Sequence, residues 1–213
     1  MAKLCEKIIC LSMLSCATTS FADFNKEDSG IFASISGGVV SSTSSGQWTS
    51  GITQNTYDYN APTTTGGTGS LRVGYLFAFG EKDKWNELYF NVAGRYNILG
   101  NVINNISGIG NNVTYSQTSI SQFGAELAIG KYWKSPFYTD IYINPGFASS
   151  GSFFTSIGIR AGVDITKRLS IFLEGASGGQ IDTASTVFDF MFWQLGASGT
   201  TYTTGQLGLQ YRF

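Results

Sequence analysis

Eight charged residues inside otherwise apolar or neutral stretches are the side chains best suited to chemistry. A carboxylate pair such as Glu126 with Asp140 could carry out general acid–base catalysis. An equal number of arginines accompanies the acids, so salt bridging is the favoured interpretation, because charges away from water are usually paired. The eight residues are Arg72, Arg95, Glu126, Asp140, Arg160, Asp164, Glu174 and Arg212.

The composition excludes most other catalytic sites. The chain contains no histidine, which removes Ser-His-Asp hydrolysis and histidine-based metal sites. Its three cysteines, Cys5, Cys10 and Cys16, all lie in the first 22 residues. The glycine clusters at 66–69 and 108–110 lack the Lys-Ser/Thr ending of a phosphate-binding loop. We therefore expect no catalytic site, no cofactor and no metal.

Residues 1–22 have the pattern of a cleavable signal peptide. Two lysines precede a short apolar run from Ile8 to Leu14, and Ser20-Phe21-Ala22 has the small-x-small form of a cleavage site. The run is shorter than the roughly 20 residues that a membrane-spanning helix needs. We expect export, followed by a single domain over residues 23–213.

The elements that must position the charges are strands, because apolar and small or polar residues alternate in eight segments. The length of each segment is close to that of a tilted strand that crosses a bilayer, which is about 9–11 residues. No apolar run reaches about 18 residues, which excludes a helical membrane protein. The expected strands are Ser29–Val40, Ser70–Phe79, Glu87–Ile98, Gln122–Trp133, Phe137–Phe147, Ser156–Ile165, Leu169–Ala176 and Gln206–Phe213.

All eight charges fall on the polar side of this alternation, whereas the apolar side carries only Lys131. In a closed barrel the polar side would face the interior, and eight strands leave room only for side chains. The charges could line a gated ion path or form a sealed, salt-bridged interior, and the sealed interior is favoured. Glycines on the same face would make room for long neighbours: Gly74, Gly124, Gly130, Gly158, Gly162 and Gly208.

The connections between the expected strands alternate between short and long, and only 148–153 breaks this pattern. Short periplasmic turns and long outer loops are typical of outer-membrane barrels. The long connections contain no lysine or arginine, which argues against binding of nucleic acid. The short connections are 80–86, 134–136, 148–153 and 166–168, and the long ones are 42–69, 99–119 and 178–200.

The last expected strand places Leu207, Leu209, Tyr211 and Phe213 on one face. Together with the signal segment, the eight strands and the alternating connections, it resembles the small eight-stranded outer-membrane β-barrels. This class includes the transmembrane domain of outer membrane protein A and the opacity-type surface proteins. The resemblance implies an all-β, closed antiparallel transmembrane barrel in contact with outer-membrane lipids. It also implies that the barrel-assembly machinery recognises Leu209, Tyr211 and Phe213.

The most apolar segment outside the expected strands runs from Val187 to Trp193. We interpret it as an arm of the last outer loop, with Phe188, Phe190, Phe192 and Trp193 available to a lipid or protein surface. Alternatively, it is a ninth strand, which would require a tenth within Gln47–Asn60.

These features predict an integral outer-membrane protein with a structural or surface-interaction role, such as an adhesin or surface antigen, and no catalysis. Its outer loops would contact a host or surface ligand. The alternative is a narrow channel or a carrier for small apolar solutes.

Overall fold

The computed structural model describes residues 29–49, 56–79, 88–109, 112–134, 136–181 and 199–213. Among them, no helix is long and apolar enough to cross a membrane. The expected signal segment, 1–22, lies outside these residues. The strands are β1 (Gly30–Thr49), β2 (Thr56–Asn60), β3 (Thr64–Phe79), β4 (Leu88–Ile109), β5 (Asn112–Lys134), β6 (Phe137–Ala148), β7 (Phe153–Asp164), β8 (Leu169–Ile181) and β9 (Gly199–Arg212).

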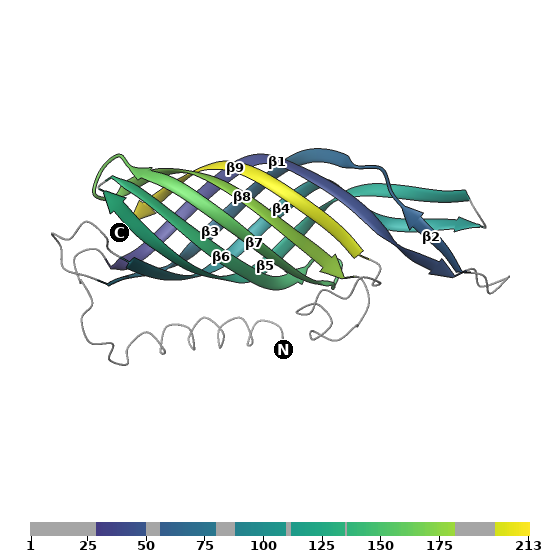
Figure 1. Cartoon of the computed structure of the whole chain (residues 1–213), viewed down its shortest axis with the longest axis horizontal. Helices are drawn as coiled ribbons and strands as arrows, with labels where there is room; N and C mark the ends of the chain where they lie inside the picture. Colours follow the sequence, from purple (N-terminus) through teal and green to yellow (C-terminus); the bar gives the residue numbers. More distant parts are fainter. Residues whose placement is uncertain (1–28, 50–55, 80–87, 110–111, 135, 182–198) are drawn as a thin grey trace.

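Eight of these strands close into an antiparallel barrel. Each pairs with its neighbour in chain order from β3 to β9, and β1 pairs with both β3 and β9. The closing pair runs in continuous register from Phe32 opposite Arg212 to Ser45 opposite Gly199. Figure 1 shows the tilted strands wrapping around a common axis. The predicted fold class, an eight-stranded closed barrel, is confirmed.

The alternative of ten strands is wrong. The candidate tenth strand, Gln47–Asn60, contains β2, which has only five residues and pairs with β1 over Ser45–Thr49. This pairing lies beyond the β1 residues that pair with β3, which end at Ser42. β2 therefore extends the β1–β3 hairpin, and the wall closes without it. The candidate ninth strand lies outside the described residues.

Two of the expected long loops are instead largely strand, so their assignment as loops is corrected. β4 and β5 continue as a hairpin to Ile109 and Asn112, with irregularities in the pairing after Leu99 and Ile103. Much of 42–69 likewise belongs to β1, β2 and β3. These sequences are rich in Ser, Thr, Asn and Gly and do not alternate in polarity, because their buried positions include small polar residues such as Ser42, Ser44 and Thr64. In Figure 1 both hairpins project beyond the barrel.

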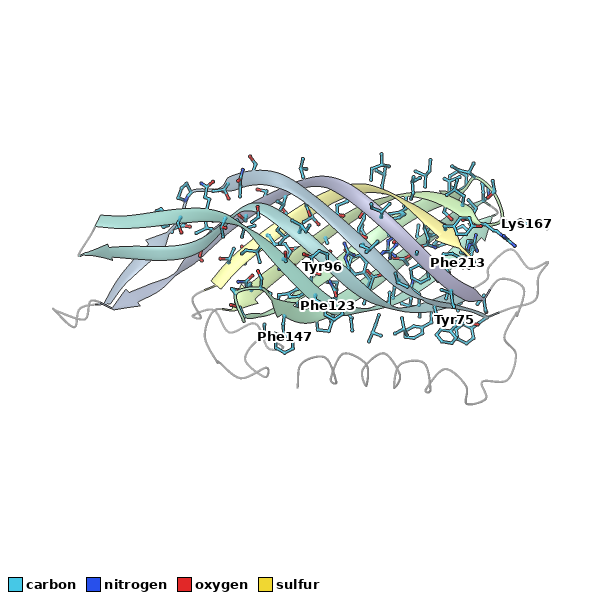
Figure 2. The ribbon with its side chains drawn as sticks, turned by 180° about the vertical axis from the view of Figure 1, so that it is seen from behind. Tyr75, Tyr96, Phe123, Phe147, Lys167 and Phe213 are labelled. Carbon is cyan, nitrogen blue, oxygen red and sulfur yellow. The ribbon has the colours of Figure 1, made fainter. Side chains whose placement is uncertain are left out.

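We call this projecting end the hairpin end, and the opposite end, where β1 begins and β9 ends, the turn end. The outer wall between them is apolar and exposed, with Val39, Ile129 and Leu173 each more than 60% accessible. Figure 2 shows Tyr75 and Phe147 projecting from this wall. An apolar surface of this extent is suited to lipid and not to water.

The interior is filled in layers. An apolar and aromatic cluster lies toward the turn end, and a second apolar cluster lies toward the hairpin end. Polar and charged side chains occupy the space between them. The first cluster contains Phe32, Leu76, Ala78, Tyr89, Ala93, Tyr138 and Phe172, and the second contains Val40, Leu99, Val102, Ile120, Ala148 and Tyr202.

Candidate functional site: the interior charge network

Glu126, on the inward face of β5, lies at the centre of the buried charges. Its Oε1 accepts hydrogen bonds from Arg72 Nη1 at 2.7 Å and from Arg160 Nη2 at 3.0 Å. Its Oε2 accepts one from Arg95 Nη1 at 2.9 Å. The Glu126 side chain has no accessible surface. Three cations around one carboxylate leave an excess of positive charge, which other carboxylates must balance.

Asp140 and Glu174 supply that balance. Arg160 Nη1 donates to both carboxylate oxygens of Asp140, at 3.0 and 2.9 Å. Glu174 accepts hydrogen bonds from Arg95 and Arg160, in contacts that include a very short pair with Arg95. Three arginines and three carboxylates from β3 to β8 thus form one neutral network, in which ionised partners strengthen each hydrogen bond.

Each arginine of the network lies over at least one aromatic ring. Arg72 Cζ lies 5.5 Å from the ring centroid of Phe32 and 5.1 Å from that of Phe172. Arg160 lies 5.4 Å from Phe172 and 5.0 Å from Tyr142. Arg95 Cζ also lies 5.0 Å from the ring centroid of Tyr142, so Arg95 and Arg160 share this ring. The result is an alternating stack of rings and guanidinium groups across the barrel, a favourable cation–π arrangement away from water.

Arg212 and Asp164 form a separate pair toward the turn end. Arg212 Nη2 contacts Asp164 Oδ2, and its Nη1 donates to Tyr132 Oη at 3.1 Å. Ser170 Oγ donates to the other Asp164 oxygen at 2.5 Å. Both side chains of the pair remain partly accessible. The structure therefore brings six of the eight sequence-predicted charges into one network and places the other two apart.

The aromatic members of the stack were missed by sequence reasoning, although a signal for them exists. Most large inward rings lie directly opposite a glycine on the adjacent strand, as Tyr142 does opposite Gly158 and Phe172 opposite Gly208. A Cβ atom at Gly158 would lie 2.4 Å from Tyr142 Cζ. Rings covering cross-strand glycines are a known means of fixing sheet geometry. The same pairing joins Tyr89 with Gly130, Tyr138 with Gly162 and Tyr202 with Gly178.

A layer of neutral polar groups separates the network from the cluster at the hairpin end. Ser36 Oγ donates to Gln206 Oε1 at 2.5 Å and lies 2.6 Å from Ser70 Oγ. Arg95 Nε donates to Asn97 Oδ1 at 2.7 Å. Both Glu126 oxygens accept hydrogen bonds from arginines. No group of three potential metal ligands occurs among the residues that the structure describes.

The remaining predicted site residues lie elsewhere. Leu209, Tyr211 and Phe213 are on the outer wall, where Phe213 N donates to Ile31 O at 3.0 Å. The Tyr211 and Phe213 rings meet edge to face, with centroids 5.1 Å apart. The loop residues lie outside the described part of the chain: Phe188, Phe190, Phe192 and Trp193.

No family model matches this chain, and no curated protein matches it. Among solved structures, the outer membrane protease OmpT from Escherichia coli is 11% identical, with 92% of this chain and 100% of that chain covered and a TM-score of 0.36. The outer membrane protein OprG from Pseudomonas aeruginosa is 13% identical, with 86% and 96% covered and a TM-score of 0.36. Likenesses this distant carry no argument about activity. The strand pairing and the exposed apolar wall confirm that the chain has the architecture of the small eight-stranded outer-membrane barrels.

Proposed function

We propose that the chain is an integral outer-membrane protein whose barrel is a sealed support for its projecting hairpins, with a structural or surface-interaction role and no catalysis. The observation that carries this proposal is the neutral network of six buried charges. Every carboxylate oxygen in it has an arginine or tyrosine partner. A carboxylate held in this way is better suited to stabilising the barrel than to catalysis.

The arrangement also favours a closed interior over a channel. An ion moving along the axis would have to separate Glu126 from its arginines, and uncompensated buried charges cost about 3–5 kcal/mol each. The clusters on both sides of the network are largely apolar, and a desolvated ion would gain few polar contacts in them.

The projecting hairpins are the surface that the barrel would present to a partner. Segment 99–119 contains no charged residue, and 42–69 contains only Asp58. In the β4–β5 hairpin, Gln117, Thr118 and Ser119 are exposed. Such a surface can bind through hydrogen bonds and shape, and its lack of lysine and arginine disfavours polyanionic ligands.

Conductance tests this proposal. The folded mature chain should show no steady current in planar bilayers, and vesicles containing it should not swell with small sugars or amino acids. A double variant, Glu126→Gln with Glu174→Gln, is the positive control, because two unbalanced arginines should hydrate the interior. Steady conductance of the unaltered protein would replace the sealed barrel with the narrow-channel alternative.

A further inference from the structure

The outer wall of β4 to β8 contains a shallow depression with a volume of about 640 Å³. It lies on the side of the barrel that faces away from the interior. Its base consists of three small residues in positions where the wall otherwise carries large apolar side chains. Thr139 is paired directly with Ala161, and Gly175 is paired with Ile159.

Large side chains border this base. Ile129, Ile159 and Leu173 all line the depression and are 62 to 64% exposed. The small residues therefore leave a groove that crosses several strands between apolar walls. On a wall that faces hydrocarbon, an acyl chain is the occupant that such a groove fits.

A fixed cation lies at the border of the groove. Lys131 lines the depression, and its Nζ lies 4.6 Å from the ring centroid of Trp133. The Trp133 indole N–H donates to Thr139 Oγ1 at 2.7 Å, which ties the ring to the base of the groove. Within the strands whose side chains are described, Lys131 is the only cation on the outer wall, and it has no carboxylate partner there.

The position of Lys131 fits a lipid headgroup. It lies three residues before the end of β5, close to the turn end, where strands reach the membrane interface. A tryptophan beside a lysine is typical of this interface, because the ring and the stem are apolar while the ammonium group reaches polar surroundings.

We propose that this groove binds one anionic phospholipid, with the phosphate at Lys131 and an acyl chain over Thr139, Ala161 and Gly175. This inference rests on the proposed membrane location, and it adds a specific lipid site on one side of the wall. One lysine near an anionic headgroup provides roughly a fivefold preference over a zwitterionic lipid.

Quenching of Trp133 by brominated lipid tests the site. The other tryptophans, Trp48, Trp85 and Trp193, are replaced by Phe, and the folded chain is placed in phosphatidylcholine vesicles. Equal minor fractions of brominated phosphatidylglycerol or brominated phosphatidylcholine are then compared. We expect brominated phosphatidylglycerol to quench Trp133 with roughly fivefold higher apparent affinity than brominated phosphatidylcholine.

Variants separate the headgroup from the groove. Lys131→Gln should abolish the preference for phosphatidylglycerol. Ala161→Leu should also reduce it severalfold, because the larger side chain fills the base of the groove, and Ala161→Val serves if the leucine variant does not fold. Ala33→Leu makes the same change on the outward side of β1, away from the groove, and should leave the preference intact.

Two results would overturn the site. Equal quenching by the two lipids in the parent protein would show that no anionic lipid is selected. If the preference for phosphatidylglycerol survives both changes at Ala161, the lipid is held only by charge attraction to Lys131 and not by the groove. Heat-modifiable migration on an unboiled gel reports insertion separately. A parent protein that does not insert would refute the membrane location, whereas an inserted one without the preference refutes only the lipid site.

Discussion

At the residue scale, the interior charges are coupled because they share partners. Glu126 contacts three arginines, whereas Arg72 has no carboxylate other than Glu126 within hydrogen-bonding distance in the described structure. Ser34 Oγ and Gln210 Oε1 accept the other hydrogen bonds of Arg72. This asymmetry allows one carboxylate and one arginine to be removed together without changing the net charge of the network.

Glu126→Gln should lower the free energy of unfolding by about 3–5 kcal/mol, because it leaves a buried positive charge without compensation. Urea unfolding in vesicles, followed by tryptophan fluorescence, measures the loss. The double variant with Arg72→Gln should be less destabilised than the sum of the two single variants, by about 0.5–3 kcal/mol. Asp164→Asn, in the partly accessible pair, is the control and should cost less than Glu126→Gln. Silent single and double variants would mean that the network faces bulk water.

The ring that covers a glycine gives a second prediction at this scale. Gly158→Ala should destabilise the barrel by about 1–3 kcal/mol, because the added methyl group meets the Tyr142 ring in a filled interior. The displaced ring would also lose its hydrogen bond to Glu174, which is 2.9 Å long. Gly205→Ala is the matched control, since a Cβ there has no atom within 4 Å. Equal stability of the two variants would contradict the packing argument.

At the scale of elements, sequence predicts strands well where one face is apolar. The expected strand Phe137–Phe147 differs from β6 only by the addition of Ala148. By contrast, β9 begins at Gly199, seven residues before the expected Gln206, because Thr200 and Thr204 point inward and the outward residues there are also polar. Alternation in polarity marks only the lipid-facing part of a strand and gives no signal for its extension into water.

The charge network shows a similar limit. Alternation predicts which face of each strand a charged residue occupies, but Glu126 on β5 meets Arg72 on β3, a strand that it does not adjoin. Contacts across the interior depend on strand tilt and on register, which accumulate around the barrel. The sequence of a single strand carries neither quantity, so the separation of Arg212 with Asp164 from the other six charges could not be predicted.

The closing strand carries a prediction of its own. Deletion of Phe213 should lower the yield of folded protein in the outer membrane without affecting export across the inner membrane, because it removes the terminal aromatic residue and one backbone hydrogen bond to Ile31. Cell fractionation with unboiled gels measures both quantities. Phe213→Tyr keeps the aromatic ring and should fold normally. A normal folded yield after deletion would exclude Phe213 from the assembly signal.

At the scale of the whole molecule, the described strands close the barrel wall without residues 182–198. β8 ends at Ile181 and β9 begins at Gly199, and these two residues are paired. Residues 182–198 therefore connect adjacent, paired strands at the hairpin end, the same end at which the other two hairpins project. We therefore expect changes within the apolar sequence Val187–Trp193 to leave barrel stability unaffected.

Replacement of residues 186–194 by a Gly/Ser linker of equal length should preserve the heat-modifiable barrel, because all eight wall strands lie outside the exchanged segment. It should reduce the adhesion of cells that display the protein to hydrophobic beads, since large aromatic side chains provide most of the available contact energy. A variant with only Phe188, Phe190 and Phe192 changed to Ser keeps the rest of the segment and should lose adhesion to a similar extent. Unchanged adhesion in both variants would exclude the aromatic arm as a binding element. Loss of the barrel itself would show that the segment takes part in folding, and the separation between support and binding surface would then fail.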